Sequence, residues 1–227
     1  MFSNRQQAGT FLAQKVIDWF SAGGHIDQNK ITVLALPRGG VPVALEVALA
    51  LGAQLNVLAS KKIGAPQQKE LAVGAVTSSG VIAIDEALVK YLQISPDYIN
   101  KEKAYLINKT KELEERWRQS AGLDTKLDIA GKVIIVVDDG VATGMTAIAA
   151  IHSLKKQGAT QIMFATPIIS IHALERLSHE YDQVIALETP AEFGAVGQFY
   201  FDFRQVDDME VVHALTQAMN KTCVKLV

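Results

Sequence analysis

Apolar residues recur along the chain with two periods, one typical of helices and one of buried strands. Residues 8–21 carry apolar side chains at helical spacing ahead of Gly23-Gly24, which predicts an N-terminal helix. Residues 31–36 and 55–59 are short, mainly apolar runs, and an apolar helical stretch at 41–51 lies between them. Strands that are apolar on both faces and separated by helices are typical of a parallel sheet covered on both sides.

The second half of the chain repeats this alternation of strand and helix. Its predicted elements are, in order, strand 133–137, helix 146–157, strand 162–165, helix 171–180 and strand 184–187. Right-handed crossovers would join these strands to the N-terminal ones in one parallel sheet. No internal repeat or long linker divides the sequence, so we expect an α/β protein with a single domain over residues 1–227.

The middle of the chain departs from the alternation. Residues 71–77 and 81–84 flank Ser78-Ser79-Gly80, a turn sequence that predicts an antiparallel hairpin, which we expect at one edge of the sheet. A short helix is predicted at 86–92.

A long polar helix is predicted at 96–120, with Ser95 as its N-cap and Pro96 as its first residue. The charged residues between 101 and 118 favour a solvated face. The alternative is that one side of this helix forms a subunit contact, which would make the protein a homodimer. The apolar residues available for that contact are Leu106, Leu113 and Trp117.

Composition narrows the classes of partner. The 227 residues are 49% hydrophobic and 20% charged, with a net charge of -2, so no overall positive field favours a nucleic-acid backbone. The N-terminus lacks the pattern of a signal peptide, and no apolar run is long enough to span a bilayer. We therefore expect a cytoplasmic protein that binds a small anionic molecule and neither nucleic acid nor membrane.

Residues 138–146 carry the clearest chemical signal. They follow the apolar run 133–137 and lead into a predicted helix, so backbone N–H groups there can hold a phosphate, aided by the hydroxyls of Thr143 and Thr146. The two carboxylates of Asp138 and Asp139 would repel a bare phosphate, so we expect them to face hydroxyl groups or a cation. A sugar phosphate satisfies both halves of the loop.

Other interpretations of this loop fit less well. Met145 stands where the phosphate-binding lysine of a Walker A loop would be. A dinucleotide-binding loop needs a G-x-G-x-x-G spacing and an acidic residue much later in the chain. An ordinary turn between strand and helix would need only one capping residue, such as Asp139 or Thr143.

The segment IIVVDDGVATGMT, residues 134–146, resembles the phosphoribosyl-pyrophosphate motif of type I phosphoribosyltransferases. The resemblance implies that family's α/β fold and a role in nucleotide metabolism. It places Asp138 and Asp139 against the ribose hydroxyls, as groups that also contribute to catalysis. Gly140 departs from the branched residue or serine usual at its position. The residues that the resemblance assigns to the 5-phosphate are Ala142, Thr143, Gly144, Met145 and Thr146.

The resemblance extends to two further segments. Pro37-Arg38-Gly39-Gly40 follows the first predicted strand and corresponds to the pyrophosphate loop, where the family often has a strained peptide bond. Its glycine amides and the Arg38 guanidinium would bind phosphate oxygens. Lys61 and Lys62 open a basic stretch that ends at Lys69, which is similar to the mobile loop that closes over pyrophosphate. Both are expected pyrophosphate ligands, Lys62 with a catalytic role, and Lys69 is expected to be solvated.

The histidines show no metal-site spacing. The resemblance nevertheless implies Mg²⁺, because displacing pyrophosphate needs its charge neutralised, and the ion would be bound mainly through substrate oxygens and water. The aromatic tail, residues 191–227, is expected to form a small hood over the acceptor base. Its candidates for stacking on the base are Phe199, Tyr200 and Phe201, which cannot all point inward if the tail is extended.

The activity implied is transfer of ribose 5-phosphate from phosphoribosyl pyrophosphate to a nitrogenous base, with release of pyrophosphate. Ala142 replaces the aspartate of hypoxanthine-guanine enzymes, which disfavours a 6-oxopurine. Lys62–Pro66 and Phe201–Arg204 resemble a bacterial branch of the family whose acceptor base the sequence does not name. The alternatives are a sensor that binds phosphoribosyl pyrophosphate or a nucleotide and regulates a partner, and a sugar-phosphate hydrolase.

Overall fold

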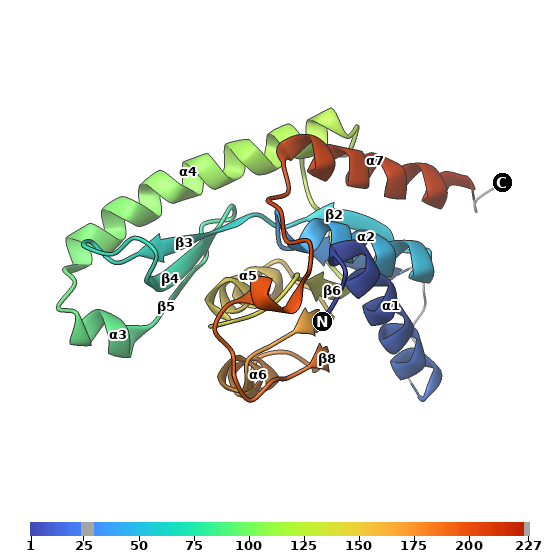
Figure 1. Ribbon diagram of the computed structural model, residues 1–227. Coiled ribbons are helices and arrows are strands. Elements are labelled where there is room, and N and C mark those ends of the chain that lie inside the picture. Colours follow the sequence, from blue (N-terminus) through green and yellow to red (C-terminus); the bar gives the residue numbers. More distant parts are fainter. Residues whose placement is uncertain (24–29, 225–227) are drawn as a thin grey trace.

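The computed structural model of the protein describes residues 1–23 and 30–224, the last three of these through their backbone alone. Five parallel strands form a central sheet (Figure 1). In spatial order they are β2 (Gln54–Val57), β1 (Ile31–Ala35), β6 (Val133–Val137), β7 (Gln161–Ile168) and β8 (Gln183–Glu188). The predicted α/β fold with a parallel sheet is confirmed, and β6 has the predicted bounds.

Helices cover both faces of the sheet because successive side chains of each strand point to opposite faces. Ile135 belongs to one apolar cluster and Ile134 to the other. The first cluster joins the sheet to α1 (Arg5–Ser21), α2 (Gly40–Leu51) and α7 (Asp208–Val224). The second joins it to α5 (Met145–Lys156) and α6 (Ile171–Ser178). The apolar strands β1, β6 and β7 are therefore buried on both sides, as their sequences predicted. The first helix ends at Ser21, just before Gly23, as predicted, and Gly24 lies outside the described residues.

A second, three-stranded sheet projects from this body (Figure 1). It consists of β3 (Ser60–Gly64), β4 (Ala72–Thr77) and β5 (Ile82–Ile84), paired antiparallel, with α3 (Glu86–Tyr91) following β5. The hairpin at Ser78-Ser79-Gly80 is thus confirmed, but its expected place at the edge of the main sheet was wrong. The mobile loop expected from residue 61 was also wrong at its start, since Lys61 and Lys62 lie in β3.

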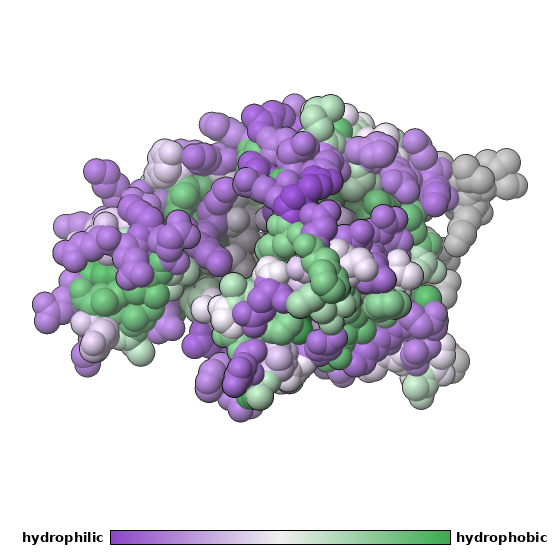
Figure 2. Space-filling model, viewed as in Figure 1, coloured by the Kyte–Doolittle hydropathy of each residue, from purple (hydrophilic) through white to green (hydrophobic). Residues whose placement is uncertain are grey.

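The long helix α4 (Pro96–Ser120) runs from the small sheet to α7 (Figure 1), and the side chain of Ser95 caps it as predicted. Figure 2 shows mainly hydrophilic residues along it, which agrees with the predicted solvated face. Glu114 and Arg118 are exceptions, because both are buried and their side chains pair at 2.8 Å. Burial raises the pKa of Glu114, whose Oε2 also accepts the Ala59 N–H.

The three apolar residues of α4 that were the candidates for a subunit contact pack at least partly within the chain. Trp117 and Leu113 belong to the main core, and Leu106 packs with the small sheet. The tail also differs from expectation, because only its first part is irregular. After the short helix η2 (Val196–Phe199) the chain continues into α7, which packs against α2 and the sheet through buried residues such as Val211 and Leu215. No helix in the described part of the chain is long and apolar enough to cross a membrane.

Candidate active site

A cavity of about 690 Å³ opens at the carboxyl ends of the central strands. Its walls come from residues 36–39 after β1, residues 59–62 at the start of β3, residues 138–144 after β6, and the tail between Val196 and Val206. The chain leaves β1 toward one edge of the sheet and β6 toward the other. Ligands of open α/β sheets bind outside such a switch point, so the fold itself favours this cavity as a binding site.

Asp138 and Asp139 both line the cavity, but their surroundings differ. The Asp139 carboxylate accepts the Nε–H of Arg5 at 2.7 Å, and both side chains are about one-tenth exposed. The Tyr200 hydroxyl donates to the Asp139 carbonyl at 2.5 Å, and a methyl group on Gly39 would overlap the Asp139 carboxylate. Asp139 therefore joins the N-terminal helix to the tail through its hydrogen bonds with Arg5 and Tyr200. The loop after β1 packs closely against its carboxylate at Gly39.

Asp138 has no cationic partner among the described residues at ion-pair distance. Its Oδ1 accepts the N–H of Asp139 at 2.9 Å. Burial raises its pKa well above the ordinary value, the charge of Asp139 adds to that rise, and the charge of Lys62 opposes it. A carboxylate in such a position gains from any ligand hydroxyl or cation that approaches it.

Arg5 was not among the residues that the sequence singled out. Besides Asp139, its guanidinium donates to the Arg204 carbonyl at 2.8 Å and lies 3.9 Å from the centre of the Phe203 ring. It thereby connects the first turn of α1 to the tail. These contacts span 134 and 199 residues of sequence, and no local pattern could have indicated them.

The loop from Ala142 to Thr146 has the geometry expected of an anion-binding turn. Gly144 is the N-cap of α5 and has a φ of 78°, a conformation that favours glycine. Thr143 is exposed, and Thr146 also lines the cavity. The Met145 side chain is buried against the small sheet, so Met145 offers a ligand only its backbone N–H.

A group of cations faces this loop across the cavity. Arg38, Lys61 and Lys62 all line it. The pKa of Lys61 is lowered, first by burial and then by the neighbouring charges of Arg38 and Lys109, and the charge of Asp208 opposes this lowering. The Nε of Arg38 lies 3.0 Å from Asp208 at the start of α7, and the Pro37–Arg38 peptide bond is cis. Four of the expected pyrophosphate residues, Arg38, Gly39, Lys61 and Lys62, are thus brought together, although Lys61 and Lys62 come from a strand. The expectation for Gly40 was wrong, because Gly40 begins α2 and its N–H donates to the Leu36 carbonyl at 3.1 Å.

The tail covers the cavity with residues other than those expected. Val196, Phe203 and Val206 line it. Tyr200 is buried against Phe2, and Phe201 is 79% exposed, so the expected stacking of Phe199, Tyr200 or Phe201 on a ligand in this cavity was wrong. Tyr200 and Phe201 do point to opposite faces of the tail, but the inward side chain, Tyr200, packs in an apolar cluster and not on the cavity.

Gly140 departs from the motif because the tail packs directly on it. A methyl group at this position would overlap Val196 and lie 2.6 Å from the Ile168 Cγ2 atom. The branched residue usual at this point of the motif would displace the tail.

Replacing Gly140 tests this packing. We expect Gly140→Ala to lower the free energy of unfolding by about 1–3 kcal/mol, because the new methyl group must move the tail or Ile168. Chemical denaturation measures the loss, and adding Val196→Ala should recover part of it. A Gly140→Ala protein as stable as the wild type would show that the tail does not press on the loop.

Within the described residues, no group of three or more histidine, cysteine or acidic side chains is arranged to hold a metal ion. Asp138 is the only carboxylate in the cavity wall, among the residues described, that is not already paired with an arginine.

Comparison with known proteins agrees with this geometry. A family model described as "Phosphoribosyl transferase domain" matches residues 3–204. A Mycobacterium tuberculosis protein, provisionally named as a phosphoribosyl transferase, is 37% identical over 218 residues, which are 96% of this chain and 47% of that protein. The chain thus spans about half the length of the curated relatives it matches.

Two further proteins are similar to this chain, one over nearly its whole length and one over a quarter of it. TT1426 from Thermus thermophilus, whose crystal structure is known, is 34% identical in sequence to this chain, and the two structures superpose with a TM-score of 0.76. The match covers 96% of this chain and 98% of TT1426. A uracil phosphoribosyltransferase of Caulobacter is 42% identical over 57 residues, which are 25% of this chain and 27% of that enzyme.

Proposed function

The chain belongs to the phosphoribosyl transferase domain family, and on that premise we propose that it transfers ribose 5-phosphate from phosphoribosyl pyrophosphate to a nitrogenous base. The observation that carries the proposal is the composition of the cavity wall. An unpaired carboxylate at Asp138, an anion-binding loop at 142–146 and the cations Arg38, Lys61 and Lys62 surround one space. This set matches the hydroxyls, the 5-phosphate and the pyrophosphate of that substrate.

Each part of the substrate then has a partner in the wall. Asp138 accepts hydrogen bonds from the ribose hydroxyls, and the 142–146 loop holds the 5-phosphate through its amides and the Thr143 and Thr146 hydroxyls. Arg38, Lys61, Lys62 and the amide of Gly39 bind the pyrophosphate, and the Gly40 N–H, which already donates to the Leu36 carbonyl at 3.1 Å, is not part of this set. Asp139, which also lines the cavity, supports this arrangement through its ion pair with Arg5.

The reaction needs no nucleophile from the protein. The bond between C1 of the ribose and the pyrophosphate oxygen breaks, with the electron pair leaving on pyrophosphate, while a nitrogen of the base bonds to C1 and loses its proton to solvent. Positive charge develops on the ribose ring, and the protein contributes by holding the reactants in line and by stabilising the departing charge. Arg38, Lys61 and Lys62 supply that stabilisation, with Lys62 also opposite Asp138.

The residues of the cavity wall fit a Mg²⁺ ion only when the substrate supplies most of the oxygen ligands. Asp138 is the one available carboxylate of the described wall, and Mg²⁺ commonly binds through one or two carboxylates, substrate phosphates and water. Asp138 would hold such an ion, which when bound neutralises part of the pyrophosphate charge.

We also propose that residues 1–227 form one domain with the irregular tail before α7 as its hood. Val196, Phe203 and Val206 give the cavity an apolar wall, and a planar base needs such a wall for stacking. In this proposal the acceptor base lies between the tail and the 138–144 loop.

Phe203 is the aromatic side chain of this wall and provides a test. We expect Phe203→Leu to raise the KM for the base about two- to tenfold, with a smaller change for phosphoribosyl pyrophosphate, because an aromatic contact with the base is lost while packing under Arg5 and against Tyr200 is largely kept. The matched control is Phe201→Leu, since Phe201 lies in the same segment and points to solvent. Equal effects of the two substitutions would remove Phe203 from the base site.

Incubation with phosphoribosyl pyrophosphate, Mg²⁺ and a panel of bases, with detection of pyrophosphate, tests the activity. The panel includes uracil because a quarter of the chain is similar to uracil phosphoribosyltransferases, and adenine and orotate because of Ala142. Release of pyrophosphate that requires one of the bases supports transfer. Binding of the substrate without release would favour the sensor, and release that does not depend on any base would favour a hydrolase.

A further inference from the structure

The backbone carbonyls of residues 141–144 in the phosphate loop all accept hydrogen bonds, the first three of them from Ser170 or Arg176. The Val141 carbonyl accepts the N–H of Ser170 at 2.9 Å, and the Ala142 carbonyl accepts the Ser170 hydroxyl at 2.6 Å. The Thr143 carbonyl accepts Nη1 of Arg176 at 3.4 Å. The Gly144 carbonyl accepts the N–H of Ile148 within α5 at 2.9 Å.

The amides of the same loop are free. Within the described parts of the chain, the N–H groups of Ala142, Thr143 and Gly144 donate no hydrogen bond. Those of Met145 and Thr146 lie in the first turn of α5, where a helix leaves its N–H groups without partners. Four successive carbonyls are thus bonded while the amides that follow them are not.

Peptide geometry connects these two observations. In a trans peptide the C=O of one residue and the N–H of the next point in opposite directions. Fixing the carbonyls of residues 141–143 toward α6 therefore turns the amides of residues 142–144 away from α6. Successive amides that converge in this way form an anion-binding nest.

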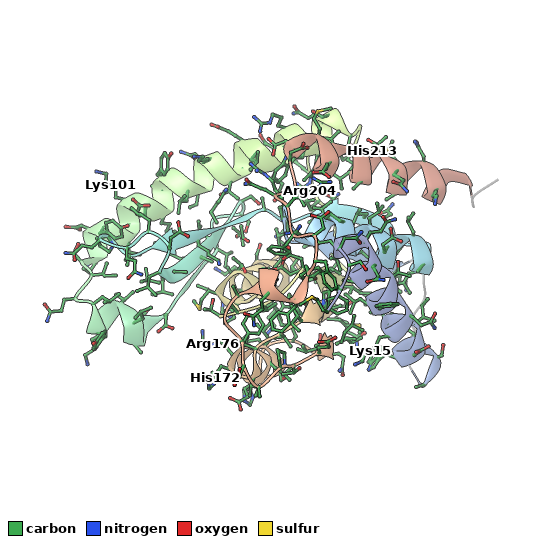
Figure 3. All side chains as sticks on the ribbon, viewed as in Figure 1. Lys15, Lys101, His172, Arg176, Arg204 and His213 are labelled. Atoms are coloured by element: carbon green, nitrogen blue, oxygen red, sulfur yellow. The ribbon has the colours of Figure 1, made fainter. Side chains whose placement is uncertain are left out.

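Both side-chain donors come from α6, which packs directly behind the loop. Ser170 is its N-cap, is buried, and accepts the N–H of Ala173 with the same hydroxyl that donates to the loop. Arg176, labelled in Figure 3, projects from α6, where its Nη1 also lies 3.2 Å from the Met145 sulfur. Its Nη2 lies 3.8 Å from Asp85, at the end of the small sheet. Arg176 also places a positive charge beside a loop that lacks a lysine of its own.

We infer that Ser170 and Arg176 are positioning residues for the 5-phosphate: they hold the loop carbonyls on the α6 side so that the loop amides face the phosphate. This inference rests on the proposed function and names two residues outside the cavity wall. Neither residue contacts the substrate. Their effect is confined to the part of the site that binds the 5-phosphate.

The test compares ligands that contain the 5-phosphate with one that does not. Ser170→Gly removes the donor but keeps an acceptable N-cap, since glycine there costs only a few tenths of a kcal/mol, and Ser170→Thr restores the hydroxyl. Arg176→Gln removes the charge, and Arg176→Lys restores it. Lys156→Gln, at the far end of α5, is the control for loss of one exposed positive charge.

Affinities for phosphoribosyl pyrophosphate with Mg²⁺, ribose 5-phosphate and pyrophosphate are measured by calorimetry. Ser170→Gly and Arg176→Gln should each bind the two ribose phosphates about three- to tenfold more weakly and bind pyrophosphate as the wild type does. Ser170→Thr, Arg176→Lys and Lys156→Gln should stay close to the wild type. Unchanged affinity for ribose 5-phosphate in both variants, or an equal loss for pyrophosphate, would overturn the inference alone. Failure of the wild type to bind phosphoribosyl pyrophosphate would overturn the proposed function and the inference with it.

Discussion

Asp138→Asn is expected to weaken binding of phosphoribosyl pyrophosphate about ten- to a hundredfold without unfolding the protein. The loss follows from replacing a charged acceptor of ribose hydroxyls by a neutral one, at about 1.5–3 kcal/mol for a hydrogen bond to a charged group. Calorimetric titration measures the affinity. Affinity equal to that of the wild type, in a folded variant, would remove Asp138 from the ribose site.

The raised pKa of Asp138 determines how this variant responds to pH. A carboxyl group whose pKa is higher in the folded state destabilises the fold as pH rises from its unfolded pKa through the folded one. Asp138→Asn lacks this cost, so at neutral pH its free energy of unfolding should be no lower than that of the wild type. Substrate affinity of the wild type should fall as Asp138 takes up its proton in acid, and the variant should lack this contribution.

Arg5→Met is expected to lower the free energy of unfolding by about 3–5 kcal/mol, because it leaves the buried Asp139 carboxylate without its partner. This is a large share of the stability of a domain of ordinary size. The Met side chain keeps much of the packing over Phe203. Chemical denaturation measures the loss, and Arg116→Met is the matched control, because Arg116 pairs with Asp208 at the surface and such pairs contribute about 0–1 kcal/mol.

The double variant Arg5→Met with Asp139→Asn separates the loss of a partner from the loss of packing. Removing the unpaired carboxylate should make this protein more stable than Arg5→Met alone. If Arg5→Met cost no more than Arg116→Met, the ion pair would not organise the site as described.

The parts of the fold that the sequence predicted are those with a local cause. β6 is a continuous apolar run that ends at an acidic pair, and both its bounds and the loop after it follow from that pattern. Ser95 and Pro96 fixed the start of α4, since an N-cap and a proline at the first position act within one turn. The approach of the loops after β1 and β6 follows from parallel pairing of these strands.

The parts that were missed depend on partners distant in sequence. Lys61 and Lys62 were predicted to lie in a basic loop because β3 has only a few apolar residues. Its strand conformation comes from pairing with β4. Arg5 sets the position of Asp139 through their ion pair. Ser170 and Arg176 donate hydrogen bonds to the loop carbonyls. α7 was not predicted because the irregular aromatic stretch before it led us to treat all residues from 191 onward as one tail.

The central claim is that the cavity at the ends of β1 and β6 binds phosphoribosyl pyrophosphate. Calorimetric titration of the wild-type protein with this compound in the presence of Mg²⁺ tests it most directly. The geometry predicts saturable binding of one molecule per chain, competed by pyrophosphate because both ligands need Arg38, Lys61 and Lys62. No binding by the folded protein, or binding that pyrophosphate does not compete, would contradict the claim.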